Sequence, residues 1–192
     1  MITESHKTPI QKAKSTEEPE KLVVATLGGG CFWCTEAVFN EVSGVVSAEP
    51  GYSGGTLPNP TYEQVSTGTT GHAEVVNVTF DQNVVSFREI LDIFFATHDP
   101  TTLNRQGADI GTQYRSVIFY HNNEQKTVAH KMINELNNSK AYKTPIVTKV
   151  DPFKSFFKAE DYHKDYFKRN PEKSYCRYVI SPKIAKLRKL LR

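Results

Sequence analysis

The sequence predicts an α+β fold, a two-layer sandwich in which helices pack on a mixed β-sheet. Two observations lead to this prediction. Short β-branched segments and amphipathic segments follow one another in the order β-α-β-β-α-β, with a further helix and strand after them. The chain has 192 residues, of which 38% are hydrophobic and 23% charged, a length and balance that suit one soluble domain with its own core.

Five segments have the composition of strands. The first, 21–27 (KLVVATL), is rich in β-branched residues and runs into three glycines. In the segment 73–80 (AEVVNVTF) alternate residues share a face, so Glu74 points the same way as Val76 and Val78. The remaining strands are expected at 45–51, 114–121 and 146–150.

Helices are expected between these strands and after them. The segment 31–43 is amphipathic and is followed by Gly44, a typical helix stop. The segment 86–97 begins with a capping box, in which Ser86 and Glu89 satisfy each other's backbone N–H groups. A third helix, 122–138, has apolar residues at four-residue spacing. This order of elements is that of a split β-α-β, ferredoxin-like core.

The chain divides into three parts. Residues 1–20 are too polar to bury much surface, so we expect a disordered tail. Residues 21–180 form the folded domain, in which the turn-rich loop 52–72 is long enough to be functional. Residues 181–192 (SPKIAKLRKLLR) form a basic helix with Ser181 as its cap and Pro182 in its first turn.

Charge and hydropathy exclude several functions. The net charge of +3 is too small to indicate nucleic-acid binding, and the basic terminal helix is better explained by packing of its apolar face on the domain. No apolar run approaches the roughly 20 residues of a membrane span, and the start of the chain lacks the apolar centre of a secretory signal. We therefore expect a cytoplasmic monomer whose three cysteines serve thiol chemistry.

The segment Gly28-Gly29-Gly30-Cys31-Phe32-Trp33-Cys34 is the first candidate for that chemistry. Cys31 begins a helix, where backbone N–H groups and the helix dipole can lower the pKa of a thiol. Cys34 lies one helical turn further on, so it could capture an oxidised Cys31 as a disulfide. The alternatives are a phosphate-binding turn, half of a zinc site, or a pair of inert buried cysteines.

Glu74 is the second candidate. If its side chain lies among the apolar residues of its strand, burial raises the pKa of the carboxyl, which can then act as a general acid. The alternative is a solvated carboxylate at the end of the strand. A third, polar set consists of Tyr52, Tyr62, Asp109 and Tyr114. His163 is expected to be a satisfied surface or cap residue.

Six motifs together resemble the peptide methionine sulfoxide reductases of type A. They are GGGCFWC, GYSGG, NPTYEQV, GHAEVV, HDPTTLNRQGADIGTQYRS and NPEKSYC, and the resemblance extends over about residues 22–180. It implies an α+β sandwich fold and the thiol-dependent reduction of methionine-S-sulfoxide, peptidyl or free, in the repair of oxidised proteins. It implies no metal and no bound cofactor.

The resemblance also implies a role for each candidate residue. Cys31 matches the nucleophile, which becomes a sulfenic acid, and Glu74 matches the acid that protonates the sulfoxide oxygen. Tyr62 and Tyr114 match the hydroxyls that hold this oxygen. In addition, Asp109 matches a carboxylate near the substrate, and Phe32 and Trp33 match the apolar wall around its methyl group.

Regeneration leaves two possibilities open. Many family members have glycine at the position of Cys34 and use a C-terminal cysteine, matched here by Cys176, to resolve the sulfenic acid. This chain has both cysteines, with Cys176 on a tail expected to be flexible, so either one or a relay of both could form the disulfide that thioredoxin reduces. A thioredoxin-like disulfide oxidoreductase and a peptide-binding module with idle cysteines are the competing functions.

Overall fold

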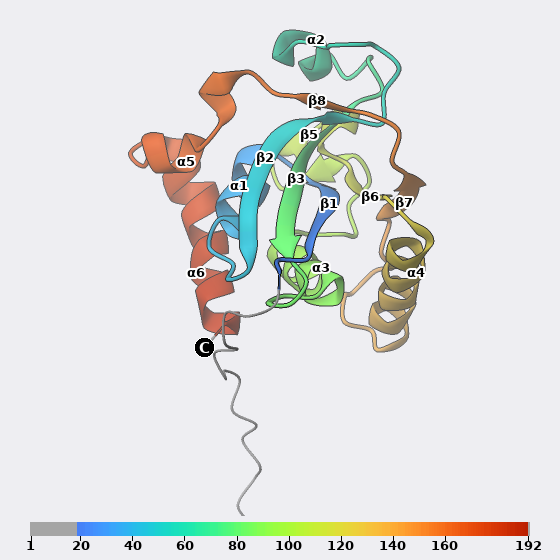
Figure 1. Ribbon diagram of the computed structural model, residues 1–192. Helices are drawn as coiled ribbons and strands as arrows, with labels where there is room; N and C mark the ends of the chain where they lie inside the picture. Colours follow the sequence, from blue (N-terminus) through green and yellow to red (C-terminus); the bar gives the residue numbers. More distant parts are fainter. Residues whose placement is uncertain (1–18, 192) are drawn as a thin grey trace, which may run out of the picture.

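The computed structural model describes residues 19–191 (Figure 1). The predicted tail 1–20 therefore lies almost wholly outside the described residues. The strands are β1 (Leu22–Gly29), β2 (Val45–Ser53), β3 (Ala73–Asp81), β4 (Arg105–Gln106), β5 (Asp109–Ile110), β6 (Ser116–Tyr120), β7 (Lys149–Pro152) and β8 (Phe156–Lys158). The helices are α1 (Phe32–Phe39), α2 (Tyr62–Ser66), α3 (Phe87–Thr97), α4 (Asn123–Asn138), α5 (Tyr166–Arg169) and α6 (Ser181–Leu190).

Six of the strands form one sheet with the order β7-β6-β1-β3-β2-β8. All neighbours in it are antiparallel except β6 and β7, which are parallel. Strands β4 and β5 form a separate small hairpin. The sheet is therefore mixed, and the predicted α+β class is confirmed.

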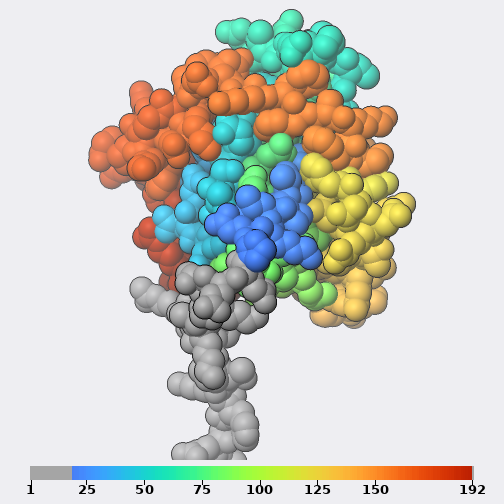
Figure 2. All heavy atoms as spheres, viewed as in Figure 1, coloured from blue at the N-terminus to red at the C-terminus, as the bar shows by residue number. Residues whose placement is uncertain are grey.

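The helices pack around this sheet. Helix α1 contacts β1, β2 and β3, while α4 contacts β6 and β7 near the other end of the sheet (Figure 1). The C-terminal helix α6 packs against both α1 and α3, so the last residues of the fold support α1. Figure 2 shows the orange segment around β8 lying directly beneath the turquoise α2 at the top of the molecule.

The main core lies on the helix-covered face of the sheet. It contains Val76, Val78 and Phe80 of β3 together with Phe32 and Phe94 from the helices. A smaller cluster on the opposite face consists of Ala73, Val75, Val117 and Phe119, against which Phe153 and Phe156 pack. Because alternate residues of a strand point to opposite faces, Glu74 belongs to the face of the main core.

Most long elements were predicted correctly. The segments 21–27, 45–51, 73–80, 86–97 and 122–138 correspond to β1, β2, β3, α3 and α4. The capping box of α3 is present: Ser86 Oγ accepts a hydrogen bond from Glu89 N at 3.2 Å, and Glu89 Oε2 accepts one from Ser86 N at 2.8 Å.

Three boundaries differ from the prediction. The helix expected at 31–43 ends at Phe39, because the chain turns before Gly44, whose φ is +89°. Tyr114 ends a 3-10 turn (Thr112–Tyr114) and lies outside β6. The strand expected at 146–150 begins only at Lys149, because the Ile146 and Val147 N–H groups bond to Asn137 Oδ1 and to the Pro100 carbonyl.

The C-terminal helix also starts differently. A π-helical turn (Cys176–Ile180) leads directly into α6, so Ser181 already has helical backbone angles and does not cap the helix. Its hydroxyl instead donates to the Cys176 carbonyl at 3.0 Å. The predicted helix 181–192 is thus a continuation of an earlier helical turn.

Candidate active site

Cys31 occupies the N-cap position of α1, where the glycine run ends. Gly30 has a φ of +96°, and a Cβ atom there would lie 2.5 Å from Gln106 Cγ, so a side chain would be both strained and crowded. The Cys31 side chain is 8% exposed, and its carbonyl accepts a hydrogen bond from Cys34 N at 3.1 Å. The turn therefore holds the sulfur nearly buried at the start of the helix.

The two thiols of α1 influence each other's protonation. Burial raises the pKa of Cys31 well above its usual value, and the interactions with Cys34 and Glu74 raise it further. A hydrogen bond from the Trp33 N–H group partly opposes this rise. The hydrogen bond from Cys31 lowers the pKa of Cys34 to about 7. The charge of Lys183 also lowers this pKa, whereas burial raises it. In the reduced protein, burial therefore opposes the lowering of the Cys31 pKa that the helix N-terminus was expected to produce.

Glu74 lies on β3 directly beside the start of α1. Its side chain is 1% exposed, and Oε2 accepts a hydrogen bond from Phe32 N at 3.0 Å. Burial raises the pKa of Glu74 to about 8, although the Phe32 N–H group opposes this shift. The buried alternative of the two sequence interpretations is therefore correct, and the carboxyl group holds a proton at neutral pH.

Two tyrosines approach Glu74 from other elements. Tyr62 is the first residue of α2, whose start is fixed by a capping box between Thr61 and Gln64. Tyr114 ends the 3-10 turn before β6. Burial, and then the charge of Glu74, raise the pKa of both phenols, that of Tyr62 to about 12. Both hydroxyls therefore keep their protons and can donate hydrogen bonds beside Glu74.

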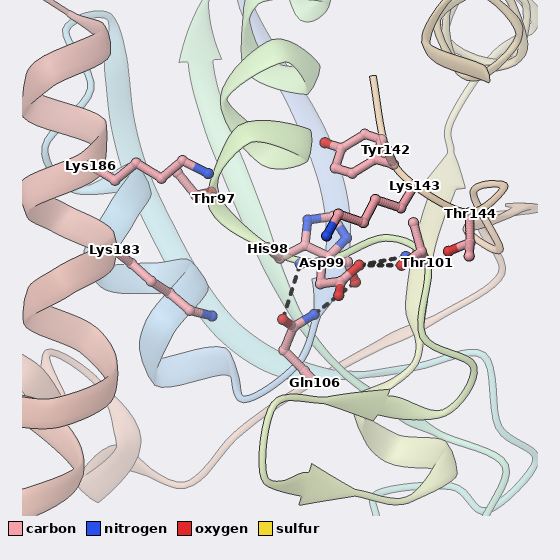
Figure 3. Close-up of a pocket in the computed structure, with 10 residues that line it drawn as sticks. All are labelled: Thr97, His98, Asp99, Thr101, Gln106, Tyr142, Lys143, Thr144, Lys183 and Lys186. Atoms are coloured by element: carbon pink, nitrogen blue, oxygen red, sulfur yellow. Dashed lines mark hydrogen bonds between the residues drawn. The ribbon is translucent and has the colours of Figure 1, made fainter. Parts of the chain in front are cut away.

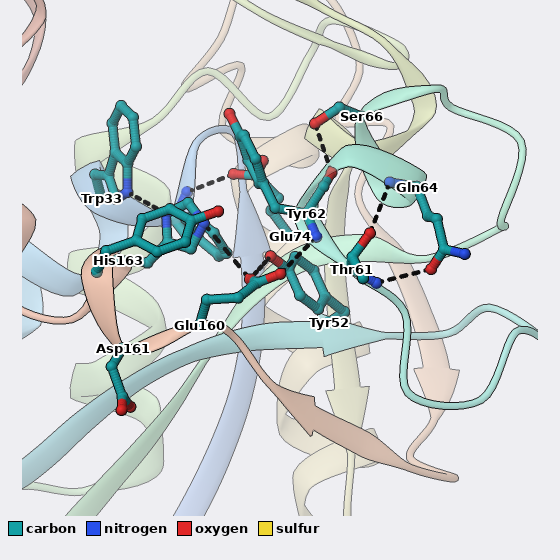
Figure 4. Close-up of polar contacts among 12 residues, drawn as sticks. Trp33, Tyr52, Thr61, Tyr62, Gln64, Ser66, Glu74, Glu160, Asp161 and His163 are labelled. Atoms are coloured by element: carbon teal, nitrogen blue, oxygen red, sulfur yellow. Dashed lines mark hydrogen bonds and ion pairs between the residues drawn. The ribbon is translucent and has the colours of Figure 1, made fainter.

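Phe32 and Trp33 form an aromatic wall next to the thiol. Phe32 is 1% exposed and belongs to the core. Trp33 is partly exposed and stacks on Tyr166 of α5, with ring centroids 3.7 Å apart and ring planes only 6° from parallel. The Trp33 indole N–H also donates to His163 Nδ1 at 3.0 Å (Figure 4).

A hydrogen-bonded chain connects Asp109 to the second thiol. The Tyr175 hydroxyl donates to Asp109 Oδ2 at 2.5 Å and lies 3.7 Å from Cys34 Sγ. Its ring meets Trp33 edge-on, with centroids 5.8 Å apart. Asp109, from the β4–β5 hairpin, is thereby held next to the wall formed by α1. The structure thus brings the predicted residues into one site, which also contains Tyr175.

A family model described as peptide methionine sulfoxide reductase matches residues 23–191 of the sequence. The chain belongs to this family. The reductase MsrA of Saccharolobus solfataricus is 61% identical over 167 residues, which cover 87% of this chain and 93% of the relative. An MsrA of Thermus thermophilus is 55% identical over 166 residues, which cover 86% and 93%.

Solved structures of the family have the same fold. The reduced form of Mxr1 from Saccharomyces cerevisiae has 36% identity and a TM-score of 0.76, and the match covers 84% of this chain and 93% of Mxr1. Methionine sulfoxide reductase A of Corynebacterium diphtheriae has 35% identity and a TM-score of 0.77, with 82% and 78% covered. The chain is therefore a methionine sulfoxide reductase, and the aromatic wall beside Cys31 is its candidate substrate site.

Cys176 of the reductase is placed differently from the prediction. Its side chain is fully buried in the main core, in the π-helical turn before α6. Burial raises the pKa of its thiol, and the charge of Cys34 raises it further. The expected flexible tail is therefore an ordered, buried turn, because Ile180, Ile184 and Leu187 anchor it in the core.

Sequence reasoning missed three site residues: Tyr175, already described, and His163 and Glu160. His163 was expected at the surface, but its side chain has no exposed area and lies beneath Phe32, Trp33 and Tyr62. Glu160 accepts hydrogen bonds from Tyr62 N at 2.7 Å and from the Tyr52 hydroxyl at 2.8 Å (Figure 4). The one available signal was the density of aromatic residues in the charged segment after the last predicted strand.

A separate cavity of about 620 Å³ lies behind the glycine turn of the reductase (Figure 3). Its lining includes Lys183 and Lys186 of α6, and Lys143 from the segment after α4. Gln106 closes it toward Gly30 and is bonded to both the N–H and the carbonyl group of Asp99, at 3.0 Å each. Lys183 is thus placed to act on Cys34 from this cavity.

Within residues 19–191, no group of three or more histidine, cysteine or acidic side chains is arranged to hold a metal ion. In the same range, no helix is both long and apolar enough to cross a membrane.

Proposed function

We propose that the enzyme reduces methionine-S-sulfoxide, peptidyl or free, with Cys31 as nucleophile and Glu74 as general acid. The observation that carries this proposal is the buried, hydrogen-bonded carboxyl of Glu74, whose pKa of about 8 keeps it protonated beside the thiol. A protonated carboxyl next to a sulfur nucleophile is what the removal of a sulfoxide oxygen requires, because that oxygen leaves only after it has taken up protons.

The first step consumes one thiol and one sulfoxide. The Cys31 sulfur supplies an electron pair to the sulfoxide sulfur, and Glu74 delivers a proton to the oxygen. An S–S bond forms between Cys31 and the substrate as the S–O bond breaks and the protonated oxygen leaves as water. A water molecule then attacks the Cys31 sulfur, the S–S bond breaks with its electron pair going to the methionine sulfur, and Cys31 is left as a sulfenic acid while methionine leaves reduced. The proton of the Cys31 thiol can pass to Cys34, whose pKa is lowered to about 7 in the reduced protein.

The surrounding residues position the substrate. Tyr62 and Tyr114 donate hydrogen bonds to the sulfoxide oxygen, and Asp109 faces the backbone of the substrate. Phe32 and Trp33 receive the methyl group, which contributes about 1–3 kcal/mol of discrimination in an apolar pocket. With the oxygen and the methyl group both fixed, only one configuration at sulfur suits attack by Cys31.

Regeneration begins with Cys34, one helical turn from Cys31. Its sulfur attacks the sulfenic acid, so that a disulfide forms and the thiol proton leaves with the sulfenic oxygen as water. Cys176, in the buried turn that packs on α1, then exchanges into this disulfide in a relay. Thioredoxin is the final reductant, a proposal supported by the solved complex of yeast Mxr1 with Trx2, which has 26% identity and a TM-score of 0.54.

The proposal extends to the molecule as a whole. Residues 21–180 form the catalytic domain, and residues 181–192 form a terminal helix attached to it. The antiparallel order β6-β1-β3-β2 supports a ferredoxin-like, two-layer core. The enzyme works without a bound cofactor, as a monomer in the cytoplasm.

The test is turnover of the two purified sulfoxide epimers with dithiothreitol as reductant. The S epimer is expected to react in wild type, Cys31→Ser to be inactive, and Glu74→Gln to lose most of the rate. Activity confined to the R epimer would contradict the assignment. Insulin reduction that is indifferent to Glu74→Gln would instead favour a disulfide oxidoreductase.

A further inference from the structure

His163 accepts the indole hydrogen bond of Trp33, and this fixes its protonation. The distance from Trp33 Nε1 to His163 Nδ1 is 3.0 Å, and an indole nitrogen can only donate. Nδ1 must therefore carry a lone pair, which leaves the ring neutral with its proton on Nε2. The ring is fully buried, so no water can replace this contact without a rearrangement of the wall.

Glu160 lies on the other side of the ring. His163 Nε2 faces Glu160 Oε2 at 3.6 Å and has no closer hydrogen-bond partner among residues 19–191. The same carboxylate accepts bonds from Tyr62 N and the Tyr52 hydroxyl. One acidic group thus faces the N–H of His163 and at the same time fixes the start of α2, which carries Tyr62.

We propose that His163 and Glu160 are positioning residues that hold Trp33 and Tyr62 in place at the candidate substrate site. Neither residue needs to touch the substrate. Glu160 favours the tautomer of His163 in which Nδ1 is an acceptor, and Nδ1 then fixes the angle of the Trp33 ring on Tyr166. The inference rests on the proposed role of Trp33 and Tyr62 in binding the sulfoxide.

This arrangement makes the aromatic wall sensitive to acid. Protonation of His163 at Nδ1 would place two N–H donors against each other at 3.0 Å, and the indole would lose its partner. The titratable groups that face His163 are Glu160, Tyr62 and Tyr162. Only Glu160 is charged near neutral pH. Burial lowers the pKa of His163 and Glu160 partly opposes this, so the switch belongs below about pH 6.5.

Trp33 offers a direct readout, since it is the only tryptophan in the chain. Its fluorescence should titrate with one transition below about pH 6.5 in wild type. In His163→Gln, which keeps an acceptor but cannot take up a proton in this range, the transition should vanish. The exposed His130 on α4 provides the matched control, because His130→Gln should leave the titration unchanged.

Kinetics of two further variants complete the test. His163→Leu removes the acceptor and should raise KM for the sulfoxide roughly three- to tenfold with a smaller change in kcat, whereas His163→Gln should recover most of the loss. Glu160→Gln keeps acceptors for Tyr62 and Tyr52 but removes the charge, so it should move the fluorescence transition to lower pH.

Two results would overturn the inference. One is a fluorescence titration in His163→Gln identical to that of wild type, and the other is an unchanged KM in His163→Leu. The fluorescence arm does not depend on turnover. If the wild-type protein reduced neither epimer, the proposed function would be wrong. The fluorescence titration would still show whether His163 holds Trp33.

Discussion

Glu74 is an acid kept neutral by its surroundings, and this sets the upper pH limit of activity. Its pKa of about 8 exceeds that of a free carboxyl because it is buried, so kcat/KM should fall as the pH rises through about 8 and the proton is lost. In Glu74→Gln this fall should disappear, with a rate lower by about 10²–10⁴-fold. A pH profile of kcat/KM for both proteins measures this, and an unchanged upper limb in the variant would assign it to another group.

Lys183 tunes the second thiol from the cavity behind the glycine turn. Its positive charge helps to lower the pKa of Cys34 to about 7, so Lys183→Gln should raise this pKa and reduce the thiolate fraction at neutral pH. The ultraviolet absorbance of the thiolate, followed against pH, measures the change. Lys186→Gln is the matched control, because Lys186 lines the same cavity but is not among the groups that shift Cys34. Equal effects of the two variants would indicate only general surface charge.

At the residue scale, local pattern predicted some features and long-range packing decided others. The alternation of β3 placed Glu74 on the apolar face, but it left open whether the carboxyl is buried there or solvated at the end of the strand. The pKa order of Cys31 and Cys34 could not be predicted, since it depends on groups more than 100 residues away, such as Tyr175 and Lys183. His163 was missed for the same reason: only the docking of its segment under α1 buries it.

The capping box of α3 should contribute measurably to stability. Ser86→Ala removes the acceptor of the Glu89 N–H group and should lower the free energy of unfolding by about 1 kcal/mol, as measured by urea denaturation. Ser86→Thr should retain most of the stability, because threonine is also a good cap. The residue lies outside the site described above, so kcat should not change. An equal loss in both variants would contradict a capping role.

At the element scale, long periodic segments were predictable and short ones were not. Strand β8 has three residues and exists because it pairs with β2, where a Cβ atom at Gly51 would lie 2.3 Å from the Phe156 ring. The residues 156–158 contain no sequence pattern that predicts this pairing with β2. Helix α2 is different: the spacing of Thr61 and Gln64 is that of a capping box, a signal that the sequence contained inside the predicted loop.

For the molecule as a whole, His98 should make folding sensitive to acid. Burial lowers the pKa of His98 to about 4, while Nδ1 bonds to the Phe94 carbonyl and Nε2 to Ser116 Oγ. Below about pH 6.5 His98 is protonated in the unfolded chain but stays neutral in the native state. The free energy of unfolding should therefore fall between about pH 6.5 and pH 4, by at most about 3 kcal/mol. Urea denaturation across this range measures the slope. His98→Asn should flatten it, and an equal slope in the variant would assign the effect to other groups.

The two outer strands of the main sheet are both short. Strand β7 has four residues and ends in Pro152, and β8 has three. A long, unpaired strand at the margin of a sheet is a template on which foreign chains can pair and aggregate. An enzyme that reduces methionine sulfoxide in other protein chains comes into contact with those chains. Because both outer strands of its sheet are short, the enzyme offers its substrate chains little unpaired backbone on which they could form additional strands.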